Sequence, residues 1–452
     1  MKASFTIPES LMAELQAAIF SKEGHEGAAY LMCGTSATGG EARLLGRSVV
    51  PVADADYLVR EPYRLSIDSG SYARAAKAAR ELGTALVFVH SHPEGIAEFS
   101  PQDDREEPAL MRFFGQRVPG KTHGSLVISG PAAARGRVWT GEGWLPASGV
   151  RVLGQRFRFL TARVGAPKPS FDRQVQAFGP EMQALIGNLH VGIVGCGGTG
   201  SAVAEQLCRL GAGTLSLFDG DALEGTNVTR VYGSRMDEVS RNKAVCLGEH
   251  LGRIGLGTEI RVFDRHILEE AVARNLRECD VVFGCTDLES PRALLVNLAL
   301  HYLIPVFDVG VKISSKEGVI EDITGRVTTL IPGAACLLCR GRITPERIRF
   351  EQLSPEAKAA EQRDGYAPEL ETRDPAVVSF TTAVAAQAVN EFLHRLTGFM
   401  GTERTATEVL VRFHAGHVGK NSMPPSAQCP CADPRQWGRG DSRDFLGVTW
   451  TA

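Results

Sequence analysis

Two histidines and an aspartate stand in a spacing that suits a metal ion. His90 ends the apolar run ALVFVH, His92 follows two residues later, and Asp103 lies eleven residues beyond His92. Because side chains alternate along a strand, residues at i and i+2 share one side, so both imidazoles can face one ion. Three protein ligands leave a zinc ion one open position for water, which is the arrangement of a catalytic site. Zinc can lower the pKa of that water to about 7 and so generate hydroxide at neutral pH.

A bare His-x-His pair is more often two surface histidines in a polar loop than a metal site. The residues around the pair are therefore needed to distinguish the two. The spacing His-x-His, seven residues, Ser, two residues, Asp resembles the signature of the JAMM/MPN zinc metalloproteases of the Prok-JAB type, over residues 5–145. The resemblance implies three ligands of a catalytic Zn²⁺: His90, His92 and Asp103. It also implies that Ser100 stabilises the tetrahedral oxyanion and that Glu26 is the general acid/base. The segment after Glu26 departs from the family pattern Glu-x-x-Gly-x-Leu-x-Gly, because Gly34 falls eight positions after it.

A glycine-rich turn between a predicted strand and a predicted helix is the second feature. It reads GCGGTG and contributes four glycines: Gly195, Gly197, Gly198 and Gly200. Glycines allow a phosphate to approach the backbone, and the N-terminus of the following helix supplies N–H donors. Alone, the pattern also fits a nicotinamide dehydrogenase, in which Asp219 at the end of the next strand would bind a ribose.

The residues beyond this turn favour an adenylyltransferase over a dehydrogenase. Basic side chains neutralise a triphosphate and its departing pyrophosphate, and a carboxylate can hold Mg²⁺. The chain offers such a set: Asp219, Asp221, Asn227, Arg230, Lys243 and Asp287. This array resembles the adenylation domain of ubiquitin-activating enzymes and their bacterial relatives of the ThiF/MoeB type. The match is dense over residues 171–310 and looser to about residue 395.

The resemblance implies a role with ATP for these residues. Asp219 would bind the ribose hydroxyls, and Asp287 would organise Mg²⁺. Three residues would hold the phosphates: Asn227, Arg230 and Lys243. Upstream, the segment FDRQVQAFG matches the entry segment of the family, whose arginine reaches the ATP site of the partner subunit. Arg173 is the matching residue, so a homodimer is expected; the alternative is an ordinary surface charge.

Four of the ten cysteines form two close pairs about ninety residues apart: Cys336 with Cys339, and Cys429 with Cys431. Thiolate pairs from two distant segments suit a tetrahedral structural Zn²⁺ that joins the tail of the chain to a core. Adenylation-domain relatives carry two CxxC pairs in these places, whereas the second pair here is CxC. No cysteine lies between residues 339 and 429, where activating enzymes that form a thioester usually carry theirs. We therefore expect activation to stop at the acyl-adenylate, with an oxyester on a hydroxyl such as Ser379 as the alternative.

The strands and helices predicted around these residues form two domains. Residues 1–150 carry β-rich runs and are predicted to form an α/β JAMM/MPN domain, followed by a linker at 151–170 that is basic and ends in Pro-Lys-Pro and Ser. Strands predicted at 190–194, 214–219, 281–285 and 304–309 alternate with helical patterns. Such alternation predicts a doubly wound, Rossmann-like parallel sheet for the adenylation domain, residues 171–452. The tail after residue 417 is rich in Pro, Gly and Ser and is predicted to be irregular.

Composition limits the function further. The net charge of −3 argues against a large nucleic-acid footprint, which needs clustered Lys and Arg. The longest apolar stretch is interrupted by polar residues, and no signal peptide is recognised, so a cytoplasmic protein is expected. The sequence thus predicts a bifunctional enzyme that adenylates the C-terminal Gly of a ubiquitin-like β-grasp protein and processes its tail by zinc-dependent peptidase action, with a conjugating-enzyme-like protein as a further partner. The alternative is adenylation and processing of a sulfur-carrier protein.

Overall fold

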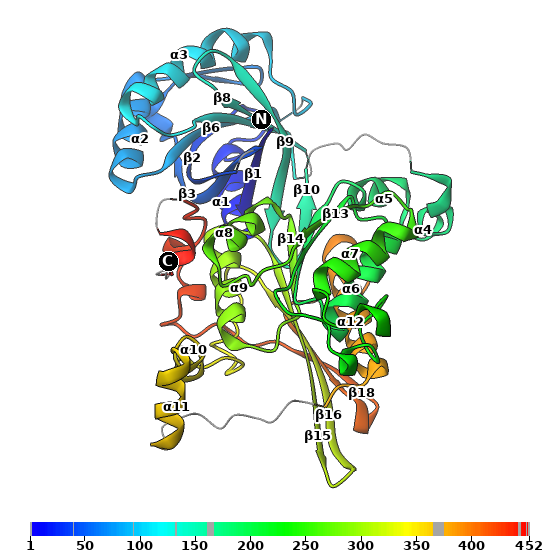
Figure 1. The fold of residues 1–452 in the computed structure, drawn as a ribbon. Coiled ribbons are helices and arrows are strands. Elements are labelled where there is room, and N and C mark those ends of the chain that lie inside the picture. Colours follow the sequence, from blue (N-terminus) through cyan, green and yellow to red (C-terminus); the bar gives the residue numbers. More distant parts are fainter. Residues whose placement is uncertain are drawn as a thin grey trace. The chain divides into compact units, whose positions relative to one another are not determined.

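The computed structural model describes residues 2–38, 40–93, 95–131, 133–160, 167–364, 375–441, 444–448 and 450 (Figure 1). The chain divides into two compact units. The first contains Met1–Ala162, Leu300–Leu303 and Pro434–Gly447, and the second contains Arg163–Ala299, Ile304–Asp433 and Val448–Ala452. Mixed α/β structure is found in both, as the sequence predicts.

An eight-stranded sheet forms the first unit. Its order is β1-β3-β2-β6-β7-β8-β9-β10, and β1 also pairs with β9, so the sheet closes on itself. The strands are β1 (Lys2–Pro8), β2 (Ala28–Ala37), β3 (Glu41–Pro51), β6 (Ala85–Ser91), β7 (Gly124–Ile128), β8 (Ala134–Trp139), β9 (Trp144–Leu153) and β10 (Phe157–Phe159). A separate hairpin consists of β4 (Tyr57–Glu61) and β5 (Arg64–Ile67), and the helices are α1 (Glu9–Ile19), α2 (Ser69–Leu82) and α3 (Pro101–Arg117).

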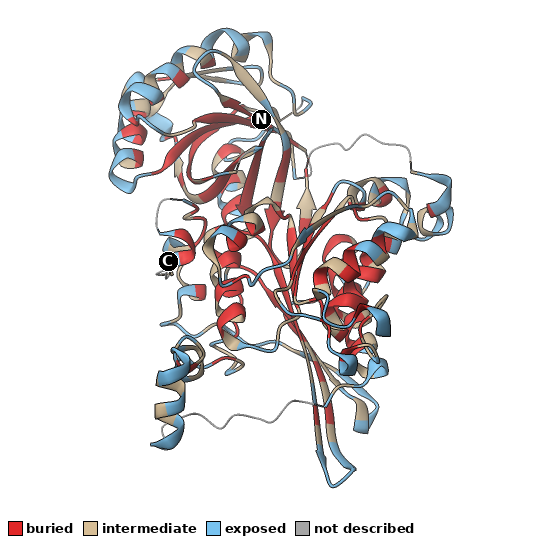
Figure 2. Ribbon diagram, in the orientation of Figure 1, coloured by how far each residue is buried: buried red, intermediate tan, exposed pale blue. Residues whose placement is uncertain are grey.

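Strand β6 is buried on both faces (Figure 2), which explains why its sequence is an uninterrupted apolar run. Val87 and Val89 pack into the hydrophobic cluster that contains α1. Leu86 and Phe88 alternate with them and pack into a second cluster, with residues of α2 and α3. By the same alternation, His90 emerges on the side of α2 and α3.

The boundaries of the first unit differ from the predicted ones. Strand β9 continues to Leu153 and pairs in parallel with β1, and β10 follows it, so the unit continues through Phe159 and does not end at residue 150. The segment 434–447, predicted as part of the adenylation domain, also belongs to this unit. Gly440 forms a parallel bridge with Thr35, and the Asp441 carboxylate accepts a hydrogen bond from the backbone N of Ala37 at 2.8 Å.

A second eight-stranded sheet forms the other unit, in the order β13-β12-β11-β14-β15-β16-β17-β18. The first five strands are parallel and the last three antiparallel. They are β11 (His190–Val194), β12 (Thr214–Phe218), β13 (Glu259–Phe263), β14 (Val281–Gly284), β15 (Val306–Lys316), β16 (Val319–Leu330), β17 (Glu408–Arg412) and β18 (His417–Asn421). The predicted doubly wound sheet is confirmed. Strand β18 corrects the expectation of an irregular tail after residue 417, because its backbone pairs with β17 despite its polar sequence.

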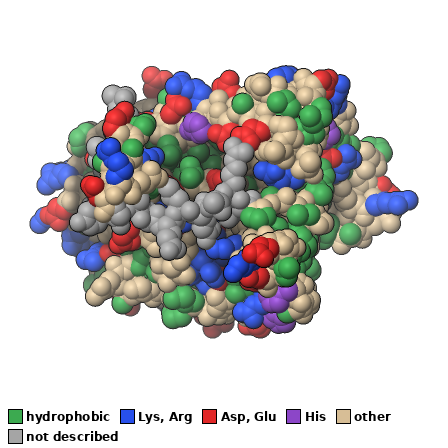
Figure 3. Space-filling model, turned by 60° about the horizontal axis from the view of Figure 1, so that its bottom comes forward, with side chains coloured by type: hydrophobic (Ala, Val, Ile, Leu, Met, Phe, Trp, Pro, Cys, Tyr) green, Lys and Arg blue, Asp and Glu red, His purple; other side chains and the backbone are tan. Residues whose placement is uncertain are grey.

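Helices cover both faces of this sheet. Figure 1 shows α9 (Glu289–His301) on one face and α6 (Gly198–Leu210), α7 (Lys243–Ile254) and α12 (Val378–Thr397) on the other. The remaining helices are α4 (Asp172–Phe178), α5 (Pro180–Ile186), α8 (Glu270–Ala273), α10 (Pro345–Glu351) and α11 (Pro355–Arg363). None of the described helices has the length and apolarity needed to cross a membrane. On the face seen in Figure 3, acidic and basic side chains are interspersed.

Candidate active sites

The two histidines and the aspartate come together at the end of β6. His90 Nε2 lies 3.5 Å from Asp103 Oδ1, and His92 Nε2 lies 3.8 Å from Asp103 Oδ2. One ligand atom from each residue falls within 4.8 Å of the others. Zinc bonds of about 2.0–2.2 Å at tetrahedral angles would place such atoms roughly 3.4 Å apart, so the three side chains need only a small adjustment to hold the ion. Both ring nitrogens of His90 are buried without a hydrogen-bond partner among the described residues, as expected for a metal ligand.

Ser100 precedes α3 and positions Asp103. Its Oγ accepts a hydrogen bond from the Asp103 backbone N at 3.2 Å, and its own backbone N donates to Asp103 Oδ2 at 2.6 Å. This reciprocal pair is a capping box, and it holds the aspartate in the first turn of the helix. Because the Ser100 hydroxyl acts here as an acceptor, its proton is still available for donation to an oxyanion.

Glu26 lies two residues before β2 and faces the metal-binding residues. Its Oε1 lies 3.9 Å from His92 Nε2, and its side chain is almost fully buried. Burial raises the pKa of the Glu26 carboxyl to about 7, against the opposing effect of His90. In contrast, Glu23 and the ring of His25 contact each other through the Glu23 carbonyl on the exposed side of the loop. The geometry therefore favours Glu26 over Glu23 as the proton-transfer group.

Three residues of this site were not recognised in the sequence: Glu107, Ser125 and Arg137. Glu107 Oε1 lies 3.6 Å from His90 Nδ1 and accepts a hydrogen bond from Ser125 Oγ at 2.7 Å. Its Oε2 accepts from Arg137 Nη2 at 2.6 Å, and the Arg137 guanidinium stacks 3.8 Å above the ring of Phe99. The signal that could have found Glu107 is its position one helical turn after Asp103, which places both carboxylates on one face of α3.

A cavity of about 700 Å³ opens beside these residues. Apolar side chains from α2, α3, β5 and β6 line much of it, among them Ile67, Tyr72, Phe88, Leu110 and Phe113. Carboxylates supply most of its charge, and no Lys or Arg of the described chain contributes to the lining. A cavity of this size can accept several residues of an extended peptide next to the metal-binding group.

The glycine turn of the second unit lies between β11 and α6. Gly195 has φ +88°, and a Cβ on Gly200 would collide with the carbonyl oxygen of Gly195, so two of the predicted glycines are needed for the turn itself. Asp219, at the end of β12, accepts a hydrogen bond from the Cys196 backbone N at 2.7 Å. Burial raises the pKa of the Asp219 carboxyl.

The other predicted ATP-site residues gather around this turn to different degrees. The side chain of Arg230 lies against Gly198, and Lys243 Nζ is 2.9 Å from Asp221 Oδ2. Asp287 is exposed and follows Cys285, whose carbonyl packs against Gly195. Asn227 is buried, and its Oδ1 accepts from the Glu224 backbone N at 3.1 Å, so its oxygen shapes the loop between β12 and α7.

Arg173 is not brought to this site within one chain. It lies exposed on α4, next to Gln174, whose Nε2 donates to the carbonyl of Arg209 at the C-terminal end of α6. The glycine turn is at the opposite end of α6, and a helix of 13 residues is about 20 Å long. An arginine side chain cannot bridge that distance.

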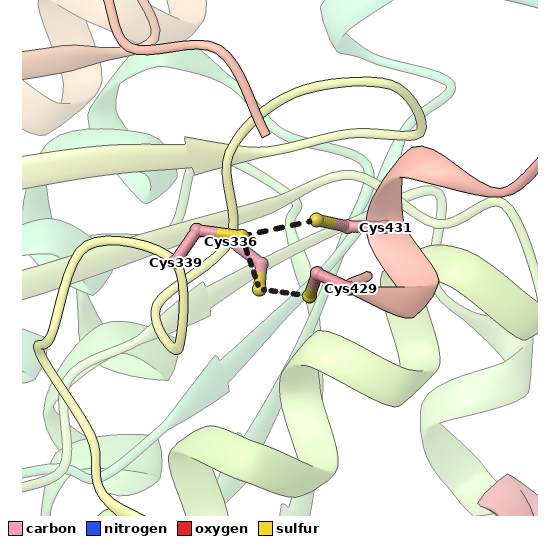
Figure 4. Close-up of side chains that lie close together, drawn as sticks. All are labelled: Cys336, Cys339, Cys429 and Cys431. Carbon is pink, nitrogen blue, oxygen red and sulfur yellow. Dashed lines mark hydrogen bonds between the residues drawn. The ribbon is translucent and has the colours of Figure 1, made fainter. Parts of the chain in front are cut away.

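The four paired cysteines form a cluster (Figure 4). The Sγ–Sγ distances are 3.8 Å for Cys336–Cys339 and 3.5 Å for both Cys336–Cys429 and Cys339–Cys431. A tetrahedron with zinc–sulfur bonds of about 2.3 Å has edges of roughly 3.8 Å, so the donor set fits zinc. The CxC spacing of the second pair is compatible with this arrangement, because a short turn at Pro430–Ala432 directs both thiols to one side.

Comparisons with known proteins identify both units. The sequence profile of the ThiF family matches residues 171–431, and that of the prokaryotic homologues of the JAB domain matches residues 8–140. The tRNA threonylcarbamoyladenosine dehydratase of Escherichia coli (strain K12) is 28% identical over 141 residues, 31% of this chain and 53% of that protein. Ubiquitin-like modifier-activating enzyme 5 of Dictyostelium discoideum is 31% identical over 168 residues, 34% of this chain and 42% of that protein.

Among solved structures, E. coli MccB with MccA-N7isoASN aligns with a TM-score of 0.47 and 16% identity, covering 59% of this chain and 75% of that one. The chain spans about half, or less, of the length of these two curated relatives.

Proposed function

The chain belongs to the ThiF family and carries a JAB-like domain N-terminal to its ThiF region, and we therefore propose that it is a bifunctional enzyme of a ubiquitin-like modifier pathway. The second unit would adenylate the C-terminal carboxylate of a β-grasp protein with ATP. The first unit would be a zinc-dependent peptidase that acts on the same C-terminal tail. Relatives named as modifier-activating enzymes support this choice of substrate class.

The observation that carries the adenylation proposal is the arrangement at the carboxyl ends of the parallel strands. The acid at the end of β12 (Asp219), the glycine turn after β11 and the acid after β14 (Asp287) follow one another along this edge. Ligands of open α/β sheets bind at that edge. The backbone N–H groups at the start of α6 would bind phosphate, and Asp219 would bind the ribose hydroxyls.

In the proposed reaction a carboxylate oxygen of the substrate attacks the α-phosphorus of ATP. The bond from this phosphorus to the bridging oxygen breaks, and pyrophosphate leaves with the electron pair. Arg230 and Lys243 would neutralise the charge that develops on the departing group. Mg²⁺ held by Asp287 would supply further charge stabilisation when bound.

The proposed homodimer gives Arg173 a role that it cannot have within one chain. Because α6 separates it from the glycine turn of its own chain, Arg173 can contribute to catalysis only in a second copy. A purely surface role would make the same residue dispensable, so the two possibilities differ in a mixed-dimer experiment.

The peptidase proposal rests on the group at the end of β6. A zinc ion on His90, His92 and Asp103 would supply a water of lowered pKa and a Lewis acid for the peptide carbonyl. Glu26 would take the proton of that water and deliver it to the leaving amine. The Ser100 hydroxyl would donate a hydrogen bond to the oxyanion.

The acceptor of the adenylated tail is proposed to lie on another protein. The six cysteines outside the zinc cluster are Cys33, Cys196, Cys208, Cys246, Cys279 and Cys285, and all except Cys285 are buried. Burial raises the pKa of the Cys285 thiol well above its usual range, so it is a poor nucleophile. Ser379 is exposed in the first turn of α12, but a serine needs an adjacent base, and no histidine is found between residues 301 and 394.

The test of the adenylation proposal is ATP–pyrophosphate exchange with a β-grasp protein that ends in Gly-Gly. Exchange should require the free C-terminal carboxylate and Mg²⁺. Lys243→Ala should suppress it by two orders of magnitude or more, since one lost charge contact in a transition state costs about 3–4 kcal/mol. Arg265→Ala changes an exposed arginine beyond β13 and serves as the matched control. Absence of exchange in the wild type with every such protein would refute the proposal.

Sulfur transfer is the second candidate, because the shielded cysteines leave the adenylate equally open to an external sulfur nucleophile. The two candidates give different products. If the enzyme serves sulfur transfer, mass spectrometry of the β-grasp protein after incubation with ATP and a sulfur donor would detect a C-terminal thiocarboxylate. If it serves conjugation, the β-grasp protein would form a thioester with a conjugating-enzyme-like partner.

A further inference from the structure

We propose that Arg292 and Arg326 form the site that receives the carboxylate of the substrate to be adenylated, because both guanidinium groups converge on one buried aspartate beside the nucleotide edge. This inference rests on the proposed adenylation and names the part of the site that would select an acid. No sequence motif pointed to either arginine.

The two arginines come from different elements and share Asp308. Arg326 of β16 donates from Nη2 to Asp308 Oδ2 at 2.7 Å, and Arg292 Nε of α9 lies 3.3 Å from Asp308 Oδ1. Asp308 is 1% exposed, and each arginine side chain is 14% exposed. The group therefore holds two positive charges and one negative charge with little access to water. Burying an uncompensated charge is costly, so an anionic partner is expected.

The hydrogen-bonding capacity of the arginines is also largely unused. A guanidinium has five N–H donors. Among the described residues, Arg292 forms only the ion pair with Asp308 and no hydrogen bond of good geometry, and Arg326 forms one hydrogen bond. A Cβ placed on Gly310 would lie 3.4 Å from Nη2 of both arginines. The Nη2 groups of the two arginines therefore lie together over a residue that has no side chain, and Arg326 Nη2 keeps one N–H beyond the one it donates to Asp308.

The order of the strands places this pair where the acid has to arrive. Along the carboxyl edge, the ribose acid of β12, the glycine turn after β11 and the metal acid after β14 are followed by β15. Asp308 pairs in register with Gly284, three residues before Asp287. The ribose end of ATP would occupy the β12 side, so the carboxylate that attacks the α-phosphate has to approach from the β15 side. Arg292 and Arg326 lie on that side.

The start of α9 holds Arg292 in place. The Glu351 carboxylate of α10 accepts hydrogen bonds from the backbone N of Glu289 at 2.9 Å and of Ser290 at 2.7 Å. These contacts cap the first turn of α9 and satisfy two of its free N–H donors. A defined position of the guanidinium lowers the entropic cost of binding a carboxylate.

A purely structural role would be the alternative: Asp308 could simply tie α9 to the β15–β16 hairpin. One arginine would be enough to neutralise one aspartate. A third arginine, Arg342, lies near enough to repel the charge of Arg326, although it is itself paired with Glu408. The structural role and the proposed role differ in what removal of the Asp308 charge should do.

The experiment uses a fluorescent synthetic peptide that ends in Gly-Gly with a free carboxylate, and the same peptide as its C-terminal carboxamide. Binding of both to the full chain is measured by fluorescence anisotropy. The wild type should bind the carboxylate about 10- to 100-fold more tightly than the amide, as hydrogen bonds to a charged group would produce. In Arg292→Gln and Arg326→Gln this preference should fall to within about threefold, with the affinity for the amide unchanged.

Asp308→Asn separates the two roles. It leaves both guanidinium groups without their internal partner, so the preference for the carboxylate should be kept or increased. A structural role predicts that Asp308→Asn loses the preference together with the arginine variants. Either that result, or equal binding of the two peptides by the wild type, would overturn the inference. A fluorescent ATP analogue bound by the wild type but not by Lys243→Ala would show that the nucleotide proposal stands even if the carboxylate site does not.

Discussion

Replacing Glu107 by glutamine should weaken zinc binding in the first unit while leaving all three ligands intact. Glu107 Oε1 lies 3.6 Å from His90 Nδ1, and this carboxylate is held in place by Ser125 and Arg137. A ligating histidine usually donates its second ring N–H to such a carboxylate, which fixes its tautomer and raises its basicity. A glutamine at this position would keep the volume of the side chain but lose its charge.

The size of the effect follows from these contacts. Mutation of such a supporting partner typically costs 10- to 100-fold in metal affinity, or about 1.4–2.7 kcal/mol. The upper part of this range is expected, because Glu107 is buried and its charge is weakly screened. The same substitution also weakens the buried ion pair with Arg137, so the thermal stability of the metal-free protein should fall as well.

Competition with a chromophoric chelator measures the zinc dissociation constant, in a Cys336→Ser background if the second site interferes. Asp104→Asn is the matched control. Asp104 lies on α3, as Glu107 does, and also pairs with Arg137, but its side chain is mostly exposed. This control should keep its zinc affinity within about twofold. Cobalt substitution offers a second readout, since a changed ligand field at His90 alters the visible spectrum. An unchanged affinity and spectrum in Glu107→Gln would show that Glu107 does not act on the metal.

Three further outcomes are expected. The wild type should bind two zinc ions per chain. His90→Ala should remove one of them without unfolding the protein, and Cys336→Ser should remove the other and lower the melting temperature. Metal analysis measures the stoichiometry, and any other number of ions would contradict the two-site assignment. Gly200→Ala should abolish nucleotide binding, because the added Cβ collides with the backbone of the glycine turn, and retention of tight ATP binding would refute this. Mixed dimers of Arg173→Ala with Lys243→Ala should regain pyrophosphate exchange, which neither variant shows alone; failure in verified mixed dimers would count against action across subunits.

Several features were open to sequence reasoning because they are local. The runs HVGIV and TLSLFD are continuous apolar stretches, which central parallel strands require, and they are found as β11 and β12. The spacing of His90, His92 and Asp103 likewise combines the alternation of a strand with the first turn of a helix. Both family assignments made from these patterns are confirmed. The roles given to the individual site residues stay predictions.

Other features depend on segments that are distant in the chain. Nothing near Gly440 indicates that it pairs with Thr35, and the length of β9 could not be read from its mixed composition. Glu107 resembles any other acid on a polar helix until the fold places it behind His90. Such long-range pairs carry no local period, so spacing alone cannot reveal them.

The two families, the glycine turn and the sets of possible metal ligands could be predicted without the structure, because each is encoded by residue types at short, regular spacings. The folded chain was needed to see that Arg173 lies far from its own glycine turn and that Arg292 and Arg326 share the buried Asp308. For the two arginines at Asp308, the cause is the order of the strands. Parallel sheets bring strands together out of chain order, and this order determines which side chains lie beside each other at the edge of the sheet.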